Sequence, residues 1–437
     1  MKEFVHLHNH SHYSLLDGLS TPTELVARAV NIGQNALALT DHGTMSGVID
    51  FHRSATKRGI KPIVGNEVYV ADNVAKKERT LYHLTLLAMN EAGMKNLMML
   101  SSMSYEYYYY KPRLDVDMLS RYSDGIIATT GCMGAPIPRA LGAGDYTTAK
   151  ALMGIFLDIY GKDRYFVELQ EHKGIPELND INQSLIAMAR KFGLGGNFIA
   201  TNDAHYASPE DATPHDYFLC VQTGKKITDT DRMKFSDPEY YLKTGEEMHS
   251  IFGHIPGALS NTVRVAEMCN VDIDYSNKMP NRYVDPVNML RHVVFEHALT
   301  DAEIDRAEHE LSIIEDMGFS SYFLIIKAIC DEAKKRGIWW NTRGSAAGSL
   351  VAQKCGITQI PPLDNGLVFE RFLNPTRVNM PDIDLDFQDD RRDEIVQATV
   401  EMFGKESFAQ IATFGKFGGR SSVRYAAKVL GISSGRS

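Results

Sequence analysis

Short apolar runs alternate with longer amphipathic segments along residues 4–201. The apolar runs suit buried strands, because each is short, rich in branched or aromatic side chains, and bounded by polar or glycine residues. The segments between them repeat apolar residues at helical spacing, which indicates helices packed on a sheet. Strands are predicted at Phe4–His8, Ala36–Thr40, Pro62–Val70, Leu84–Ala88, Gly125–Thr129, Tyr165–Gln170 and Asn197–Thr201, and helices at Thr23–Asn31, Gly47–Lys57, Glu91–Met103, Tyr146–Tyr160 and Leu178–Phe192. Repeated strand–helix units predict the α/β class, with a parallel sheet or barrel.

Most of the predicted strands end at, or close to, a residue type that binds metal ions. Functional side chains of α/β folds gather where parallel strands end, so these residues are expected to share one rim. The candidate ligands are His8, His10, Asp17, His42, Glu67, His83, Cys132, Asp203 and His205. Imidazole, carboxylate and thiolate groups together suit Zn²⁺, Mn²⁺ or Fe²⁺, and a set of this size is enough for two or three ions. Such ions activate water against a phosphate ester, although a lone histidine more often has a structural role.

Three further histidines lie close to the same positions. Strand alternation places His6 on the same face as His8 and His10, but deeper and away from the rim. The sequence leaves open whether His12 and His172 are additional ligands.

Residues 105–110 read Tyr-Glu-Tyr-Tyr-Tyr-Tyr, and Lys111 and Arg113 follow them. Tyrosines beside basic residues can stack on the bases of a single strand. The same composition also fits a partly buried aromatic loop that covers the metal rim, and the sequence leaves both interpretations open.

The chain changes character after Pro256, and Val271–Pro280 is predicted to be a strand followed by a linker. Two helices are then predicted at Asp301–Met317 and Tyr322–Lys335. The first of them has acidic residues in its first turn, and Gly318 ends it.

The stretch Pro381–Phe387 places Asp382, Asp384 and Asp386 at alternate positions. Alternation is the period of a β-strand, so the three carboxylates are predicted to share one face. Like charges on one face repel unless a cation neutralises them, and Mg²⁺ binds one or two carboxylates together with substrate phosphates. A pair of such ions is the usual clamp for in-line phosphoryl transfer. A solvated acidic edge strand is the alternative.

Small residues dominate Asn341-Thr-Arg-Gly-Ser-Ala-Ala-Gly-Ser-Leu350. Successive amides and serine hydroxyls in such a loop can cradle phosphates. Arg343 adds charge, and Arg371 and Arg377 lie close in sequence to the carboxylates, where arginines bind triphosphate oxygens. A tightly packed helix start is the alternative explanation.

A basic stripe follows the last acidic residue, Glu406. It consists of Lys416, Arg420, Arg424 and Lys428, at intervals of four. On a helix these side chains line one face, which is either solvated or contacts the phosphates of duplex DNA without reading its sequence.

Composition and charge limit the class of protein. The 437 residues are 44% hydrophobic and 23% charged, which is ordinary for a soluble globular chain with two or three domains. The net charge of −9 gives no sign of a nucleic-acid partner, although local basic patches are compatible with it. No apolar run approaches a membrane span, the N-terminus lacks a signal-peptide pattern, and the five cysteines are scattered. We therefore expect a cytoplasmic protein without a membrane partner.

Five motifs resemble the PHP (polymerase and histidinol phosphatase) domain, in the version found in bacterial DNA polymerase III alpha subunits. They are His8-Asn9-His10, Thr40-Asp41-His42-Gly43, Gly65-Asn66-Glu67, Gly131-Cys132 and Asn202-Asp203-Ala204-His205. The resemblance implies a distorted (β/α)7 barrel with a trinuclear metal site. In some members this site performs 3′–5′ exonuclease proofreading, and in others the domain is structural. All nine candidate positions keep ligand-competent residues.

The second half resembles the palm of the same family, the C-family DNA polymerases. Arg343–Ser349 is similar to its nucleotide motif, and Phe369–Phe387 is similar to its first catalytic motif. The resemblance implies that Asp382 and Asp384 hold two Mg²⁺ ions, that Arg343, Gly344, Ser345, Ser349 and Arg377 bind the nucleotide, and that Lys416, Arg420, Arg424 and Lys428 begin the thumb and contact DNA. The implied domains are a PHP domain at 1–275, a partial palm at 276–415 and the start of a thumb at 416–437.

The resemblance implies the N-terminal portion of a replicative DNA-directed DNA polymerase. Its implied partners are primer–template DNA, deoxynucleoside triphosphates, and a completing polymerase segment or other replisome subunits. The family's third catalytic aspartate lies on a later strand, so we expect no primer extension by these 437 residues alone. Two alternatives stay open: a stand-alone metal-dependent phosphoesterase or exonuclease, and a non-catalytic scaffold half of a split polymerase.

Overall fold

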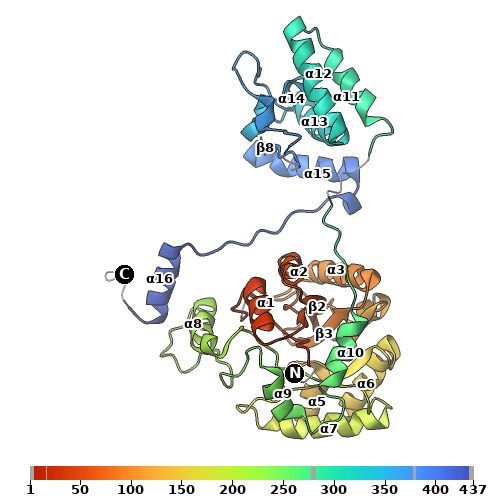
Figure 1. The fold of residues 1–437 in the computed structure, drawn as a ribbon, viewed down its shortest axis with the longest axis vertical. Coiled ribbons are helices and arrows are strands. Elements are labelled where there is room, and N and C mark those ends of the chain that lie inside the picture. Colours follow the sequence, from red (N-terminus) through yellow and green to blue (C-terminus); the bar gives the residue numbers. More distant parts are fainter. Residues whose placement is uncertain (1–3, 16, 277–281, 377–379, 433–437) are drawn as a thin grey trace. The chain divides into compact units, whose positions relative to one another are not determined.

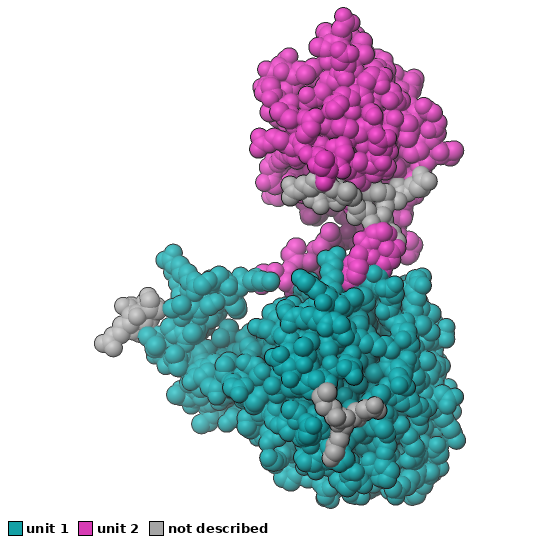
Figure 2. All heavy atoms as spheres, in the orientation of Figure 1, with its two compact units in different colours: residues 1–273, 416–437 teal, residues 274–415 magenta. Residues whose placement is uncertain are grey.

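The computed structural model of the chain describes residues 4–15, 17–276, 282–376 and 380–432. It contains two compact units, which Figure 2 colours separately. Unit 1 comprises Met1–Ile273 together with Lys416–Ser437, and unit 2 comprises Asp274–Gly415. The described residues from Lys416 onward are thus grouped with unit 1, and the start of a thumb that the resemblance implies at 416–437 stays a prediction.

Unit 1 is built on a curled sheet of six strands in the order β1-β2-β3-β4-β5-β6. The strands are β1 (Ala36–Leu39), β2 (Lys61–Val70), β3 (Tyr82–Ala88), β4 (Ile126–Thr129), β5 (Tyr165–Leu169) and β6 (Phe198–Ala200). The pairs β1–β2, β4–β5 and β5–β6 are parallel, and the α/β class predicted from the strand–helix pattern is confirmed.

Helices surround this sheet (Figure 1). Those predicted from the sequence are α1 (Pro22–Asn31), α2 (Val48–Lys57), α3 (Glu91–Glu106), α6 (Tyr146–Tyr160) and α7 (Glu177–Lys191). Those that the sequence did not reveal are α4 (Val116–Arg121), α5 (Pro136–Gly142), α8 (Ala212–Thr223), α9 (Gly245–Phe252) and α10 (Ser260–Met268). The late helix α16 (Gly419–Val429) packs beside α8, and the Ile227 N–H donates to the Val429 carbonyl.

The N-terminal segment, residues 4–10, closes the sheet without forming a regular strand. On one side His6 forms a parallel bridge with Leu37 of β1. On the other side Asn9 forms a parallel bridge with Ala204, which lies just beyond β6, and the His10 N–H donates to the Ala204 carbonyl at 2.7 Å. The strand predicted at Phe4–His8 is therefore wrong, because this segment bends between two partners. The seventh strand of the expected barrel is present only as these isolated bridges.

Strand β3 runs antiparallel to both of its neighbours, which corrects the expectation of a parallel sheet. Residues 71–81 join β2 to β3 without a helix, so the chain reverses direction as a hairpin does. The register pairs Tyr69 with His83 and Glu67 with Thr85. The beginning of β3, and not its end, therefore lies at the rim where the parallel strands end. This reversal brings His83 beside Glu67.

Local sequence signals begin and end the elements of unit 1. Thr21 forms a capping box with Glu24 at the start of α1, and Pro22 occupies the first turn. Strands β1, β4 and β5 are buried along their whole length, which explains why they read as continuous apolar runs. The core of unit 1 lies between these strands and the helices outside them.

In the described residues of unit 2, five helices pack with a two-stranded antiparallel ribbon. The helices are α11 (Pro286–Phe295), α12 (Asp301–Asp316), α13 (Ser320–Lys335), α14 (Leu350–Lys354) and α15 (Arg392–Phe403), and the strands are β7 (Trp340–Arg343) and β8 (Asp384–Phe387). The two helices predicted in this region are confirmed as α12 and α13. The strand expected at Val271–Pro280 is wrong for residues 271–276, which form none, and residues 277–280 lie outside the described part of the chain. The acidic strand is shorter than predicted, because it begins at Asp384.

Along the described stretches of the chain, no helix combines the length and the apolar composition needed to cross a membrane.

Candidate functional site

The nine candidate ligands of unit 1 lie together at the rim of the sheet. Each has a ligand-type atom within 4 Å of such an atom of another member of the set. Three overlapping groups have geometry suited to a metal ion: His8, His10 and Asp203; His10, His42 and His205; and His42, Glu67 and His83. Because His10 and His42 each belong to two of these groups, the candidate metal sites lie next to each other.

The carboxylate of Glu67 is at the centre of the cluster. Its Oε1 lies 3.2 Å from His8 Nε2 and 3.4 Å from Cys132 Sγ. Its Oε2 lies 2.5 Å from His42 Nδ1 and 3.1 Å from His83 Nδ1. A carboxylate with one oxygen toward each side can bridge two metal ions.

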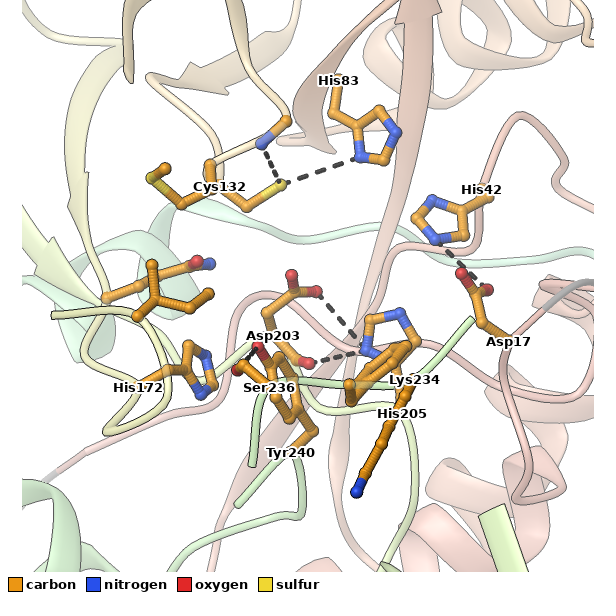
Figure 3. A pocket seen from close by; sticks show the side chains of 15 residues that line it. Asp17, His42, His83, Cys132, His172, Asp203, His205, Lys234, Ser236 and Tyr240 are labelled. Carbon is orange, nitrogen blue, oxygen red and sulfur yellow. Dashed lines mark hydrogen bonds and ion pairs between the residues drawn. The ribbon is translucent and has the colours of Figure 1, made fainter. Parts of the chain in front are cut away.

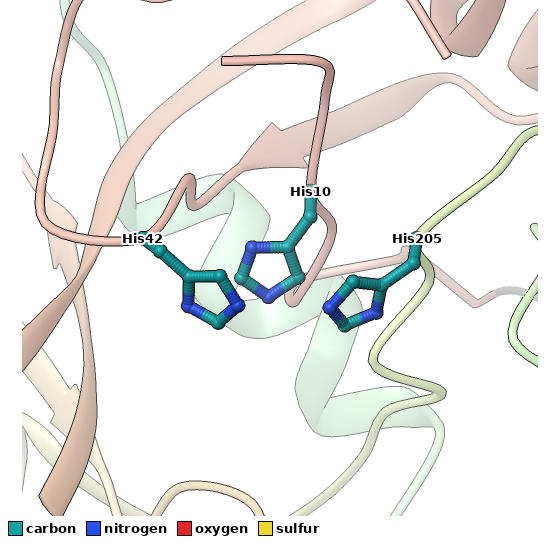
Figure 4. A group of neighbouring side chains, drawn as sticks. All are labelled: His10, His42 and His205. Carbon is teal, nitrogen blue, oxygen red and sulfur yellow. The ribbon is translucent and has the colours of Figure 1, made fainter. Parts of the chain in front are cut away.

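Three imidazole rings of the cluster, those of His42, His10 and His205, stand side by side (Figure 4). The His10 ring lies between the other two, with its centroid 4.0 Å from that of His42 and 4.3 Å from that of His205. His10 Nε2 is 3.1 Å from Asp203 Oδ1, and His42 Nε2 is 3.4 Å from Asp17 Oδ1. His10 and His42 therefore each have a carboxylate beside the ring.

The cluster opens into a cavity of about 360 Å³ (Figure 3). Asp17, His42, His83, Cys132, Asp203 and His205 line it, whereas His8, His10 and Glu67 lie beneath them. His172 also lines the cavity. Its ring stacks on Tyr240 at 3.9 Å, and its Nδ1 lies 3.7 Å from Asp237 Oδ1.

Asp203 has a left-handed backbone, with φ of 47°. This conformation is costly for a residue other than glycine and persists only where surrounding contacts impose it. The neighbouring Asn202 supplies them, because its side-chain amide donates to the carbonyls of Glu239 and Tyr241 and its oxygen accepts from Lys243 Nζ. The Asn-Asp-Ala-His motif thus fixes the direction of the Asp203 carboxylate.

Burial and charge act in opposite directions on the histidines. Burial, together with the charge of His42, lowers the pKa of His10 to about 3. Burial also disfavours a charge on His8, but the carboxylates of Asp203 and Glu168 outweigh it and hold the pKa of His8 well above its usual value. His10 is therefore neutral and ready to bind a metal, whereas the charge on His8 balances the carboxylates in the absence of a metal.

Burial and neighbouring charges also shift the pKa values of Glu67 and Cys132. Burial alone would raise the pKa of Glu67, but His83, His42 and His8 lower it well below its usual value. Burial and the charge of Glu67 raise the pKa of the Cys132 thiol well above its usual value. A thiolate at Cys132 therefore requires a cation nearby.

The buried polar atoms of the cluster test whether a metal fits. Atoms without a hydrogen bond include His8 Nε2, His10 Nε2, Asp17 Oδ1, His42 Nδ1, Glu67 Oε2 and Asp203 Oδ1. Buried polar atoms are normally hydrogen-bonded, so a group of them facing each other indicates a missing common partner. The imidazole, carboxylate and thiol donors match the ligands of divalent transition metals, and the site fits such ions.

Glu168 is a site residue that the sequence analysis missed. It is buried on β5, and its Oε1 accepts hydrogen bonds from His8 Nδ1 at 2.7 Å and Thr201 Oγ1 at 2.6 Å. Its Oε2 accepts from Thr129 Oγ1 at 2.5 Å. A buried acid in a strand that is otherwise apolar was the signal that could have revealed it.

Two of the further histidines stand apart from the cluster. His6 is buried and donates from Nε2 to the Lys243 carbonyl at 2.8 Å. The ring of His12 contacts that of Tyr13 at a tilted angle, with 4.6 Å between the centroids. Only His172, of the three, faces the cavity of the cluster.

In unit 2 the antiparallel ribbon brings the acidic strand beside the glycine–serine loop. The register pairs Arg343 with Asp384 and Asn341 with Asp386. A Cβ at Gly344 would lie 3.5 Å from Asp384 Oδ2, so the Asp384 carboxylate faces the loop. Gly344 has φ of 81°, a conformation that favours glycine.

The other residues predicted to bind metal or nucleotide in unit 2 differ in exposure. Asp382 precedes β8 and is exposed, as are Arg343 and Ser345. Arg343 pairs with Asp386, and its Nη2 donates to Asp386 Oδ1 at 2.9 Å. Arg377 lies outside the described residues.

Ser349 is buried, which separates it from the exposed part of the loop. Its hydroxyl caps α14 by accepting the Ala352 N–H, and it donates to Glu310 Oε2 at 2.8 Å. The buried Glu310 carboxylate also accepts the N–H groups of Leu350 and Val351 and pairs with Arg306 at 2.6 Å. This network holds the loop in place.

The basic stripe is exposed in unit 1. Arg420, Arg424 and Lys428 lie one turn apart on α16, and Lys416 precedes the helix.

The part of unit 1 that contains most of the ligand cluster is similar to a PHP domain, because the family model described as "PHP domain" matches residues 6–172. A second family model, "Bacterial DNA polymerase III alpha NTPase domain", matches residues 275–437. The chain is 42% identical to the DNA polymerase III subunit alpha of Borreliella burgdorferi, over 98% of this chain and 39% of that one. Identity to the subunits of Treponema pallidum and Thermus aquaticus is 40% and 37%, over 98% of this chain and 38% and 42% of theirs. The chain is therefore a homologue of the DNA polymerase III alpha subunits and spans about two fifths of their length, which confirms the resemblance.

Among solved structures, an amidohydrolase from Chromobacterium violaceum is 18% identical, with a TM-score of 0.28, over 45% of this chain and 84% of that one. This likeness is too weak to support an inference.

Proposed function

We propose that unit 1 is a metal-dependent phosphoesterase that removes nucleotides from the 3′ end of single-stranded DNA. The observation that supports this proposal best is the convergence of nine ligand-type residues at one cavity, six of which have a buried nitrogen or oxygen atom without a hydrogen bond. A structural metal site is closed by its ligands, whereas this cluster opens to a cavity that can admit a substrate.

The ligand set would hold two or three ions, with Zn²⁺ or Mn²⁺ preferred over Mg²⁺ because imidazole and thiolate are among the ligands. When bound, such ions would supply the Lewis acidity that polarises a phosphate ester and makes water nucleophilic at neutral pH. Glu67 would be a ligand at the floor of the site. His8 would be oriented by Glu168, and the outer residues Asp17, His42 and His205 would complete the rim facing the substrate.

The test is release of nucleotides from a 5′-labelled single strand by the purified chain with Mn²⁺ or Zn²⁺. We expect cleavage that chelation abolishes and that His8→Ala and His10→Ala lower by at least about a hundredfold, since each removes a metal ligand. Asp384→Asn, in unit 2, is the matched control and is expected to cleave at the wild-type rate. Equal cleavage by wild type and the histidine variants, or none by a metal-loaded wild type, would contradict the proposal and favour a non-catalytic scaffold.

We further propose that unit 2 is the nucleotide-binding part of a DNA polymerase palm. Its homology to the alpha subunits and the Asp384 carboxylate facing the Gly344 loop support this second function. Asp382 and Asp384 would hold two Mg²⁺ ions, and Arg343, Gly344, Ser345 and Arg377 would contact the triphosphate. In that role Arg343 must exchange its contact with Asp386 for one with phosphate.

Nucleotide binding tests this palm assignment without requiring polymerisation. We expect a fluorescent deoxynucleoside triphosphate to bind in Mg²⁺, and Asp384→Asn to weaken that binding about tenfold or more, since it removes a metal-bound charge. His8→Ala, which changes unit 1, is the control and is expected to leave nucleotide binding unchanged. Unchanged binding in the Asp384 variant would contradict the assignment.

The proposed setting is the cytoplasm, with primer–template DNA and a further polymerase segment or other replisome subunits as partners. The exposed basic stripe of α16 would add phosphate contacts, and substituting Arg420 and Arg424 by alanine is then expected to reduce the salt dependence of DNA binding.

A further inference from the structure

A cluster of exposed aromatic side chains lies next to the metal cavity. Tyr105, Tyr107, Tyr108 and Tyr110, named here the tyrosine platform, are exposed by 52%, 39%, 57% and 59%. Tyr105 and Tyr108 stack on each other at 6.0 Å between ring centroids. Large aromatic groups exposed together on a soluble protein indicate an interaction surface. The partly buried loop that the sequence offered as the alternative is compatible with these exposures, so the choice between the two interpretations depends on what surrounds the rings.

The platform is anchored from below. Arg113 is fully buried, and its guanidinium donates to the carbonyls of Tyr109 at 2.6 Å and Lys76 at 3.0 Å. The Arg113 N–H also donates to the Ser104 carbonyl at the end of α3. One buried cation thereby joins the tyrosine segment to the loop that contains Lys76, so the exposed rings are presented on a fixed backbone.

Tyr110 has a left-handed backbone, with φ of 63°. Among the non-glycine residues that the structure describes, Tyr110 shares a positive φ only with Asp203 of the metal cluster. Such strain is found mainly where function requires a fixed geometry, and here the pairing of Tyr109 with Lys111 imposes it. The turn directs the Tyr110 ring outward, where Arg79 packs over it at 4.4 Å.

Two contacts connect the platform to the metal rim. Lys111 Nζ donates to the hydroxyl of Tyr69 at 3.0 Å, and the Tyr69 ring lies 5.9 Å from that of His42 and 5.2 Å from that of His83. Burial raises the pKa of Tyr105, and a hydrogen bond with Thr44, two residues after His42, opposes that rise. The tyrosine platform therefore lies next to the candidate ligands His42 and His83.

Cations outnumber the acidic residues Glu78 and Glu106 around the platform. Lys76, Arg79 and Lys111 lie on or directly beside the segment that Arg113 anchors. Aromatic faces flanked by cations are the surface that single-stranded nucleic acid recognises, because bases stack on the rings and phosphates contact the cations. A purely apolar protein partner would not explain the basic side chains.

We propose that the tyrosine platform binds the single-stranded DNA that leads into the metal cavity, with unpaired bases stacked on Tyr108 and Tyr110. This inference rests on the proposed hydrolysis of DNA ends and specifies its substrate: a strand several nucleotides long and not a mononucleotide ester.

The test measures binding of a fluorescein-labelled oligothymidylate of about twelve nucleotides, a length typical of stacking sites, by anisotropy in the presence of a chelator. Tyr108→Ala and Tyr110→Ala are each expected to raise Kd about tenfold, whereas Tyr108→Phe keeps the aromatic face and is expected to stay within twofold of wild type. Tyr146→Ala, an exposed tyrosine on α6, is the matched control. Melting temperatures of all variants identify any loss of folding.

Photo-crosslinking with a bromodeoxyuridine oligonucleotide supplies a second readout, and the crosslinked peptide is expected to contain residues 105–111. Equal Kd values for wild type and both alanine variants, with crosslinks elsewhere, would overturn the proposal and leave the platform as a protein-docking face. Because binding is measured without metal, absence of hydrolysis by the metal-loaded wild type contradicts the phosphoesterase proposal alone. In active preparations, the preference for oligonucleotide over bis(p-nitrophenyl) phosphate is expected to fall about tenfold in Tyr108→Ala.

Discussion

The Nδ1 atom of His8 lies 2.7 Å from Oε1 of Glu168, and neither side chain is exposed to solvent. This contact leaves His8 Nε2 pointing at Glu67 and Asp203, 3.2 and 3.3 Å away. A carboxylate behind a metal-binding histidine fixes its ring and increases its basicity. Glu168 therefore positions a buried histidine of the candidate metal centre without being part of the ligand set predicted from sequence.

We expect Glu168→Gln to lower metal affinity about 10- to 100-fold, because an amide fixes the His8 ring less firmly than a carboxylate does. Competition with a chelator of known affinity measures this change. The exposed Glu177→Gln on α7 is the control for loss of charge. An unchanged metal affinity in the Glu168 variant would show that its hydrogen bonds serve only the packing of β5.

Metal addition to the chelated protein is expected to raise the melting temperature of unit 1. A ligand that binds only the folded state at about 100 times its Kd adds about 2.7 kcal/mol, which shifts the transition by several degrees. In His10→Ala this shift is expected to be much smaller, because His10 belongs to two of the three candidate groups. His254→Ala, at an exposed position, should respond as wild type does, and an equal shift in all three proteins would contradict the site.

Ser349→Ala is expected to destabilise unit 2 by about 1–2 kcal/mol, because it removes the cap of α14 and one donor to the buried Glu310. Chemical denaturation measures this loss. Nucleotide affinity is expected to stay within twofold of wild type, since Ser349 is buried.

Ser345→Ala is the matched comparison on the exposed side of the same loop. It is expected to change stability by less than about 0.5 kcal/mol and to weaken nucleotide binding. If instead Ser349→Ala alone weakened nucleotide binding, Ser349 would be a nucleotide-binding residue, as the family resemblance implies.

Unit 2 is expected to carry a pH-dependent ion pair between Glu303 and Lys354, whose Nζ lies 2.7 Å from Glu303 Oε1. The hydrogen bond from Lys354, with that from the Thr300 N–H, lowers the pKa of Glu303 to about 2. The folded state then binds fewer protons than the unfolded state, so this stabilisation is present above pH 4.5 and is lost as the pH falls toward 2.

Glu303→Gln keeps the capping geometry at the start of α12 and removes the charge. Because the pair is partly exposed, solvent screening limits its contribution to about 1 kcal/mol. The difference in unfolding free energy between wild type and variant should therefore be about 1 kcal/mol at pH 7 and decrease between pH 4.5 and 3. A difference independent of pH would show that the charge does not contribute.

The sequence predicted much of the centre because the ligands follow buried strands. Periodicity located β1, β2 and β5 within one or two residues, and the strand ends carried the histidines and carboxylates that the structure brings together. Helices such as α4 and α5 were not predicted, because short helices repeat too few apolar positions to show a period.

Buried polar residues whose partners are distant in sequence were harder to interpret. Ser349 matched a family nucleotide motif, and nothing local revealed that Glu310, far away in sequence, buries its hydroxyl. Glu168 looked like a charge within an apolar strand, and its partners Thr129 and Thr201 belong to or follow two other strands.

Taken alone, the order of amino acids determined the class of fold, the ligand types and the alternation of acids on the ribbon, because these depend on local spacing. The tertiary structure decided the direction of β3, and with it the place of His83, because strand pairing is set by contacts between residues distant in sequence. It also decided which polar groups are buried together, and so which form the candidate metal centre and which hold the loops in place, because burial is a property of the packed chain and not of any one segment.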